Sequence, residues 1–148
     1  MQTALVIVFC WVWLGAGPAW ASLGQTAVSV HIDQQALQAQ RHTTAHDGYV
    51  VEYLEAADVT VVREYVSPAG LVFGLAWEGP KVPDMAQLLG DYFPAYRDAL
   101  HAAVLPRGPW QVQMGDLVAE LSGHLGAFAG RAYLMSLVPS PYTSAVIQ

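Results

Sequence analysis

A serine, a histidine and two acids come close together in one stretch of the chain: Ser122-Gly123-His124 follows Asp116 and Glu120. A hydrolase needs a serine nucleophile within reach of a base, and a histidine oriented by a carboxylate can be that base. Neighbours on a strand point to opposite faces, however, so nearness in sequence does not establish this contact. No G-x-S-x-G elbow is present. The simpler interpretation is that Ser122-Gly123 forms a turn and His124 flanks it.

His42 and His46 have the i, i+4 spacing of two metal ligands on one helix face, and Asp47 lies beside them. The segment HTTAHDG is poor in helix formers and offers no obvious third ligand. We therefore interpret it as a solvated loop and expect neither a metal site nor a cofactor.

Carboxylates form the third group, with Glu52, Glu55 and Glu64 on neighbouring predicted strands. Alternation places Arg63 on the face opposite to Glu64 and on the same face as Tyr65. This predicts a half-buried Arg63 paired with a carboxylate, an arrangement that is more often structural than catalytic. No glycine-rich phosphate loop exists.

Three strands have clear signals: residues 49–56, 60–67 and 71–78 are rich in β-branched and aromatic residues. The turn between the last two is Pro68-Ala69-Gly70, with proline at a fixed φ and glycine free to take a positive φ. In the third strand, alternation predicts one bulky and one nearly flat face, and a flat face lets a helix pack closely. The bulky face would carry Leu71, Phe73, Leu75 and Trp77, and the flat face Val72, Gly74 and Ala76.

Residues 83–104 have apolar positions at helical spacing, and Pro94 falls inside them, where its ring collides with the carbonyl of Gly90. This predicts one long kinked helix. Before the strands, residues 28–32 alternate as a short strand, and Asp33 could cap a short helix through Gln40. A single longer helix across residues 26–40 is the alternative.

Further strands are expected at 110–114, 117–121 and 125–134, with a hairpin around Ser122-Gly123. The predicted fold is α+β, an antiparallel meander of five to six strands packed against the long kinked helix, with a short N-terminal helix. Residues 22–138 would form the single domain, and residues 139–148 a loose C-terminal tail.

The composition excludes several classes of function. The chain of 148 residues has 12 acidic and 6 basic residues, a formal net charge of −6 and a pI near 5.1, which argues against nucleic acid as a partner. One cysteine excludes an intramolecular disulfide and a cysteine zinc site. A charged fraction of 12% indicates either a compact domain with an uncharged polar surface or a face covered by a partner or near a membrane.

Residues 1–21 have the features of a secretory signal peptide. The apolar run from Ala4 to Ala16 is shorter than the about 20 residues that span a bilayer. Pro18 follows it, and Ala19-Trp20-Ala21 has the small-x-small pattern of a cleavage site. The start lacks the usual Lys or Arg, so an uncleaved N-terminal anchor is the alternative. The sequence predicts an exported protein of the periplasm or the extracellular space, attached to a membrane only if the leader is retained.

Three segments together carry a family resemblance: AWASLG, then VVREYVSPAGLVFGLAWEGPKVPDMAQLLGDYF, then GDLVAELSGHLGAFAGRAYL. They resemble exported bacterial proteins of domain-of-unknown-function family 2844, over nearly the whole mature chain. The resemblance implies a protein of the bacterial envelope or a secreted one. It implies no activity and supplies no catalytic residue.

Two functions from different classes remain. The first is a non-enzymatic binding or assembly module of the cell envelope with an envelope protein as partner. Its binding residues would be Trp77, Trp110, Arg63, Tyr65 and His124, although the two tryptophans could equally cap the ends of the core. The second is a small exported hydrolase or carbohydrate-active enzyme that uses His124 with Asp116, Glu120 or Glu64. We favour the first, because no catalytic cluster is evident.

The cleavage site generates a direct test. N-terminal sequencing of the exported protein is expected to begin at Ser22, because signal peptidase cuts after a small-x-small pattern. Recovery of intact Met1 in the membrane fraction would show instead that the leader is an anchor.

Overall fold

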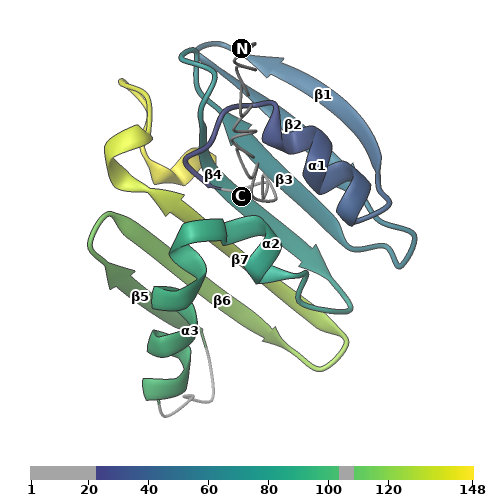
Figure 1. Ribbon diagram of the computed structural model, residues 1–148, viewed down its shortest axis with the longest axis vertical. Helices are drawn as coiled ribbons and strands as arrows, with labels where there is room; N and C mark the ends of the chain where they lie inside the picture. The colour runs from purple at the N-terminus through teal and green to yellow at the C-terminus, as the bar shows by residue number, and fades with distance from the viewer. Residues whose placement is uncertain (1–22, 104–108) are drawn as a thin grey trace, which may run out of the picture.

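A seven-stranded antiparallel sheet carries three α-helices on one side (Figure 1). The computed structural model describes residues 23–103 and 109–148, so the leader and residues 104–108 lie outside the described part. The strand order is β1-β2-β3-β4-β7-β6-β5. The strands are β1 (Gln40–His46), β2 (Tyr49–Glu55), β3 (Val61–Val66), β4 (Val72–Gly79), β5 (Trp110–Met114), β6 (Leu117–His124) and β7 (Ala127–Leu134).

The sheet consists of two meanders, β1–β4 and β5–β7, which join where β4 pairs with β7. The α+β class is therefore confirmed, but the predicted number of strands was too low. The missed strand is β1, which had been interpreted as a loop. Its residues pair with β2 along their whole length, from Gln40 opposite Glu55 to His46 opposite Tyr49. Asp47-Gly48 is the two-residue loop between them, a common hairpin connection.

The N-terminal segment forms α1 (Ser29–Ala36), so the strand predicted over 28–32 is wrong. The alternative of one longer helix across 26–40 is right about the helix, but α1 is shorter at both ends. Val30 is fully buried, whereas Val28 is exposed. Burial follows helical spacing, because Val30 and Asp33 both face the sheet. Asp33 was expected to cap the helix, and it instead lies within it.

The predicted helix over 83–104 is interrupted. It comprises α2 (Met85–Leu89), the 3₁₀ turn η1 (Gly90–Tyr92) and α3 (Phe93–Ala102). The break lies where the kink was expected, because Pro94 cannot continue a helix from the preceding turn and occupies the first turn of α3 instead. The Asp84 carboxylate caps α2 by accepting from the backbone N–H groups of Ala86 at 2.9 Å and Gln87 at 3.2 Å.

A β-bulge in β4 changes which side chains share a face. Tyr65 pairs with Gly74 and Val66 pairs with Val72, so Phe73 is an extra residue without a partner on β3. As a result Phe73 points away from the helices, although alternation placed it with Leu75 and Trp77. The expectation that a helix packs on the flat face is also wrong: the helices cover Leu75 and Trp77.

Both faces of the sheet carry a cluster of buried apolar side chains. The first face, under the helices, carries the larger core, which includes Leu54, Val62, Leu75, Trp77, Leu88, Leu89, Leu117 and Leu134. We call the face that points away from the helices the second face. It carries a smaller core: Val51, Tyr65, Phe73, Ala76, Val118, Tyr133 and Ile147.

The C-terminal segment covers part of the second face and is not loose. It contains two 3₁₀ turns, η2 (Met135–Leu137) and η3 (Ser144–Val146). Ile147 is fully buried over Gly74, where an added Cβ would lie 2.5 Å from Ile147 Cδ1. Small residues in β4 therefore accommodate this segment rather than a helix.

The last hairpin turns later than expected. β6 continues through Ser122 and Gly123 to His124, and Leu125-Gly126 forms the connection to β7. Among the described helices, none is long and apolar enough to cross a membrane.

The turn at Gly70 can be tested directly. Gly70 has φ +77°, and an added Cβ would contact nothing within 4 Å, so a substitution acts through backbone strain alone. We expect Gly70→Val to lower the free energy of unfolding by about 1–3 kcal/mol. Denaturant unfolding measures this. The control is Ala69→Val, which adds similar bulk at the exposed neighbour, and equal stability of the two variants would contradict the assigned turn.

Candidate functional site

One row of polar side chains crosses the second face at right angles to the strands. The pairing register places Arg63 of β3, Ala76 of β4, Arg131 of β7, Glu120 of β6 and Gln111 of β5 opposite one another in turn. These side chains come from segments far apart in the sequence. They are neighbours because β4 pairs with β7.

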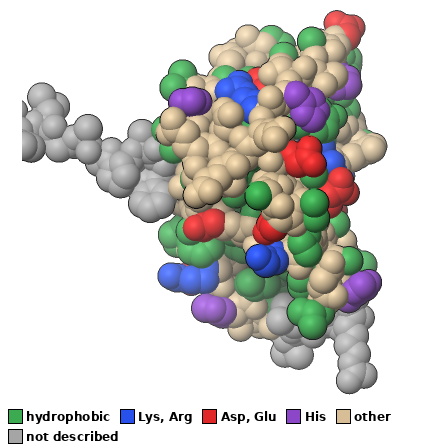
Figure 2. Space-filling model, turned by 90° about the vertical axis from the view of Figure 1, so that its right-hand side faces the viewer, with side chains coloured by type: hydrophobic (Ala, Val, Ile, Leu, Met, Phe, Trp, Pro, Cys, Tyr) green, Lys and Arg blue, Asp and Glu red, His purple; other side chains and the backbone are tan. Residues whose placement is uncertain are grey.

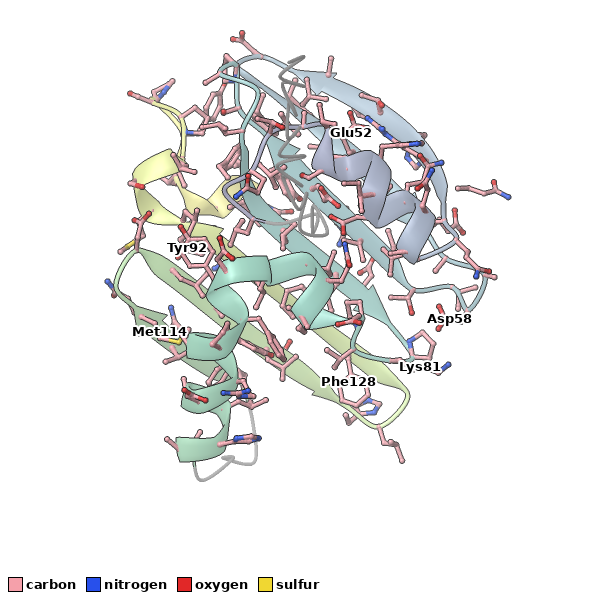
Figure 3. The ribbon with its side chains drawn as sticks, viewed as in Figure 1. Glu52, Asp58, Lys81, Tyr92, Met114 and Phe128 are labelled. Carbon is pink, nitrogen blue, oxygen red and sulfur yellow. The ribbon has the colours of Figure 1, made fainter. Side chains whose placement is uncertain are left out.

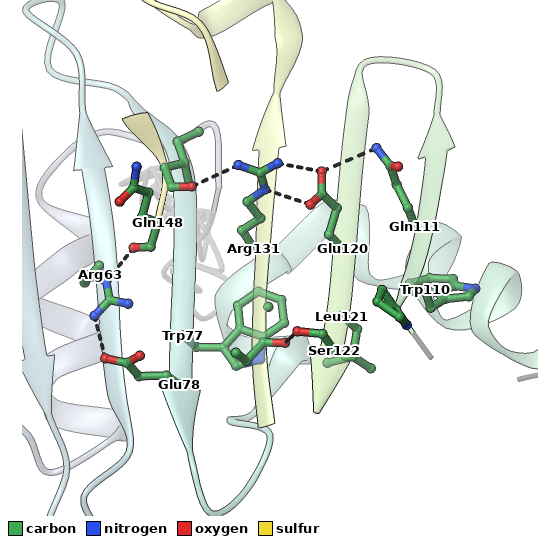
Figure 4. Close-up of a pocket in the computed structure, with 14 residues that line it drawn as sticks. Arg63, Trp77, Glu78, Trp110, Gln111, Glu120, Leu121, Ser122, Arg131 and Gln148 are labelled. Atoms are coloured by element: carbon green, nitrogen blue, oxygen red, sulfur yellow. Dashed lines mark hydrogen bonds and ion pairs between the residues drawn. The ribbon is translucent and has the colours of Figure 1, made fainter. Parts of the chain in front are cut away.

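A groove of about 520 Å³ opens along this row (Figure 4). We call it the polar groove and define it by its seven polar side chains: Arg63, Glu78, Gln111, Glu120, Ser122, Arg131 and Gln148. Ala129 lies between them on β7 and is exposed. The small side chain of Ala129 leaves the middle of the groove open.

Arg63 forms one side of the polar groove. Its Nη1 donates to Glu78 Oε1 at 2.9 Å, and its Nε donates to the backbone oxygen of Gln148 at 2.6 Å. The hydrogen bond and the charge of the guanidinium hold the pKa of the Glu78 carboxyl below its usual value. The structure thus confirms that Arg63 is partly buried and paired with a carboxylate.

Arg131 forms the other side. Its Nε and Nη2 donate to the two carboxylate oxygens of Glu120, each at 2.9 Å, and its Nη1 donates to the backbone oxygens of Ser144 and Ile147 at 3.1 Å. Gln111 Nε2 donates to Glu120 Oε1 at 3.3 Å. The bond to Glu120 raises the pKa of Arg131 above its usual value. Each arginine of the polar groove is therefore neutralised by its own glutamate.

A second hollow, of about 620 Å³, lies on the other side of the C-terminal residues, over β1, β2 and β3. Two stacked ring pairs stand beside it: His42 on Tyr53, with centroids 4.4 Å apart, and His46 on Tyr49, at 4.7 Å. Each pair is formed across β1 and β2. One face of each tyrosine ring is thus covered by a histidine.

The two histidines cannot hold one metal ion. They lie on one strand four residues apart, which separates them by about 13 Å. No group of three or more His, Cys, Asp or Glu residues within 23–103 and 109–148 is arranged to hold a metal ion.

The structure separates the five binding residues selected from the sequence. Trp77 and Trp110 are 1% and 8% exposed and belong to the core on the first face, where Trp110 packs edge to face on Tyr96 of α3. They fill the core, which was the other interpretation of these residues. Arg63 and Tyr65 do come together, because both hydrogen bond the backbone oxygen of Gln148. His124 is exposed near the tip of the β6–β7 hairpin.

The residues of the hydrolase alternative are dispersed. His124 and Glu120 are four residues apart on β6, about 13 Å. Asp116 lies at the other end of that strand, where it accepts from Ser136 Oγ at 2.5 Å. Glu64 is buried on the first face. Sequence reasoning selected none of Glu78, Gln111 or Arg131, and strand alternation with the β4–β7 register was the signal that would have found them.

A buried carboxyl pair lies under α1, on the first face. Asp33 and Glu64 are each 1% exposed and share a hydrogen bond, and Gln87 Nε2 donates to Asp33 Oδ1 at 2.8 Å. Burial raises the pKa of Asp33 to about 6. Burial and the neighbouring Asp33 charge raise the pKa of Glu64 well above its usual value. The pair joins α1, β3 and α2.

The pKa of Glu52 shifts in the opposite direction to those of Asp33 and Glu64. Glu52 lies beside α1 (Figure 3). It accepts from Arg41 Nε at 2.9 Å and from Thr43 Oγ1 at 2.6 Å. Burial raises the pKa of Glu52, but the hydrogen bonds outweigh it and hold the pKa below its usual value. The partners of a buried acid thus decide the direction of its pKa shift.

Comparison with known proteins adds a family but no activity. A protein-family model described as "Protein of unknown function (DUF2844)" matches residues 19–147. Neither the curated proteins nor the solved structures contain a match to this chain.

The carboxyl pair predicts how stability depends on pH. Raised pKa values mean that the folded protein keeps protons that the unfolded chain releases, so this contribution is complete below about pH 4 and is lost as the pH rises through the folded values. We expect the free energy of unfolding to fall by on the order of 2 kcal/mol between pH 5 and pH 8. Denaturant titrations across this range measure it.

Glu64→Gln should be more stable than the wild type at pH 8 and should lose the part of this dependence that Glu64 contributes, because an amide cannot ionise. Asp33 remains buried in this variant and keeps its own part. The matched control is Glu55→Gln at the exposed end of β2, which should keep the slope. Stability that is constant or rises from pH 5 to pH 8 in the wild type would contradict the assignment.

Proposed function

The chain belongs to the DUF2844 family of proteins of unknown function, and from its geometry we propose that it is a non-enzymatic binding module of the bacterial cell envelope. The ligand lies in the polar groove on the second face. The observation that carries this proposal is that the charged side chains of the groove are held in place by fixed partners before any ligand arrives.

Preorganisation favours binding, because side chains that are already ordered lose little conformational entropy when a ligand arrives. Arg131 makes four hydrogen bonds, two to Glu120 and two to backbone oxygens of the C-terminal segment. Arg63 is fixed on two sides by Glu78 and Gln148. The groove therefore presents a defined set of donors and acceptors.

The same side chains give little support to catalysis. Catalytic acids and bases need pKa values tuned towards the working pH. In the polar groove Glu78 has a lowered pKa, and Glu120 is bound by Arg131 through both oxygens. His124 is the base of the hydrolase alternative, and it is not among the groove residues. Binding without turnover accounts for this arrangement better than hydrolysis does.

The envelope assignment rests on the sequence. The apolar leader that ends in Ala19-Trp20-Ala21 supports export, although it lies outside the described residues. On the side of the molecule shown in Figure 2, acidic and basic side chains are interspersed among uncharged ones. A surface of this kind suits contact with an uncharged polar ligand better than contact with nucleic acid.

Filling the groove tests the proposal. Ala129→Trp places a large ring between Glu78 and Ser122, beside Arg131, at an exposed strand position, so the fold should be retained while the groove is blocked. The control is Ala127→Trp, two residues along β7 on the same face but outside the groove. Protein purified after expression with its own leader would be mixed with separated envelope fractions: sacculi, membrane vesicles and soluble periplasmic protein.

We expect the wild type and Ala127→Trp to co-sediment or co-elute with one fraction, and Ala129→Trp to lose about tenfold or more of that binding, equivalent to about 1.4 kcal/mol. Circular dichroism melting of both variants checks their folding. Absence of binding to every fraction, or equal binding by the two tryptophan variants, would refute the proposal.

A further inference from the structure

Resting on the proposed function, we infer that the ligand in the polar groove is a neutral glycan chain. The juxtaposition behind this inference is that of two arginine–glutamate pairs, Arg63 with Glu78 and Arg131 with Glu120, which face each other across a groove with a small, partly apolar floor.

Charge balance excludes an anion as the natural ligand. Both guanidinium groups already bind a carboxylate at 2.9 Å. A phosphate or carboxylate on the ligand would have to displace Glu78 or Glu120, or lie beside it, and like charges repel at such distances. A cationic ligand would in the same way be repelled by the two arginines. The groove therefore selects a ligand without formal charge.

Donors and acceptors alternate along the groove, which matches hydroxyl groups. Arg63 Nη2 has no hydrogen-bond partner among the described residues, and Glu78, beside it, is half exposed. Gln111 and Glu120 form a similar neighbouring pair of amide and carboxylate on the other side. A hydroxyl both donates and accepts, so two adjacent hydroxyls of a sugar can bond an arginine and its glutamate together.

The floor suits the apolar faces of sugar rings. Between the polar walls, the exposed apolar lining of the groove is Ala129, beside the bare backbone of Gly130, with Pro109 at one end. Leu121, Trp110 and Ile147 lie below as packed side chains of the two cores. Carbohydrate rings present C–H groups on their flat faces, and burial of these groups against apolar atoms is favourable. A ligand with hydroxyls at its rim and C–H groups on its faces fits a groove that is polar at its walls and apolar below.

The direction of the groove argues against an extended peptide. Peptides bind sheets most often by adding a strand at an open edge, with backbone hydrogen bonds parallel to the sheet. The row from Arg63 to Gln111 instead crosses four strand spacings, about 19 Å, over strands that are already paired on both sides up to β6. That span exceeds a single sugar ring, so a chain of rings is the occupant.

A glycan array tests the inference with the purified exported protein. It should carry neutral hexose and N-acetylhexosamine oligomers beside uronic-acid and sulfated oligomers. We expect saturable binding of a neutral oligomer by the wild type and by Ala127→Trp, and about tenfold or more weaker binding by Ala129→Trp. Isothermal titration with that oligomer gives the affinities.

Glu78→Gln tests the charge argument separately. This variant removes the carboxylate that neutralises Arg63 at a position where the side chain is 56% exposed, so folding is retained. We expect its ratio of acidic to neutral glycan binding to rise about fivefold or more over the wild type. The control is Glu55→Gln, an exposed glutamate of β2 outside the groove, which should leave the ratio unchanged.

The outcomes separate the two proposals. Binding of acidic glycans only, or of no neutral glycan, overturns the glycan inference, and an unchanged ratio in Glu78→Gln overturns its charge argument. If groove-dependent binding is instead found to a protein or to membrane vesicles, the proposed function stands and the glycan inference is wrong. If binding of a neutral glycan is insensitive to Ala129→Trp, the groove is not the site and both fall.

Discussion

Pairing of β4 with β7 joins the two meanders, and the close packing of Trp77 on Gly130 makes this pairing compatible with a filled core. The two residues are opposite one another in the register, and an added Cβ at Gly130 would overlap the indole ring. Because residue 130 has no side chain, the indole can lie flat across the strand under the helices. The same pairing brings Arg63 and Arg131 to opposite sides of one groove on the second face, so the core on one side of the sheet and the candidate site on the other depend on it.

The two arginines of the second face hold the C-terminal segment on the sheet and also line the candidate site. Burial of Ile147 over Gly74 brings the C-terminal segment to the sheet, and backbone oxygens of that segment then accept from Arg63 and Arg131. Tyr142 adds a contact at the other end, where its ring packs on Gly48 and its hydroxyl donates to the backbone oxygen of Asp47. The segment therefore fixes the arginines from one side while the glutamates fix them from the other. Rigid side chains of this kind are what a binding site needs.

The first face contains a buried pair of carboxyl groups that is unfavourable at neutral pH. Asp33 and Glu64 are buried together with no cation between them, and one oxygen of Glu64 has no hydrogen-bond partner among the described residues. Burying a carboxyl group is unfavourable for its charged form, so the folded state retains a proton there. The pair connects α1 to the sheet by a polar contact where an apolar one would be more stable at neutral pH. Glu52 avoids this cost because Arg41 and Thr43 bind it.

The sequence alone predicted the elements whose structure depends on residues close by in the chain. The strands β2, β3 and β4 follow from β-branched and aromatic runs, the turn at Gly70 from proline and glycine, and the helix break near Pro94 from the proline ring. The sequence did not predict β1, because its polar residues show no hydrophobic alternation. The Asp47-Gly48 loop was the one signal of a hairpin there. Hydrogen bonding to β2 makes this segment a strand.

Only the tertiary structure decided which side chains share a face, which are buried and which strands are neighbours. The bulge at Phe73 moves one ring to the second face, the core encloses both tryptophans, and the β4–β7 register makes Arg131 and Glu120 neighbours of Arg63. The β4–β7 register pairs residues that are far apart in the chain, such as Gly74 with Tyr133, and the alternation of side chains within one strand contains no information about which strand lies beside it.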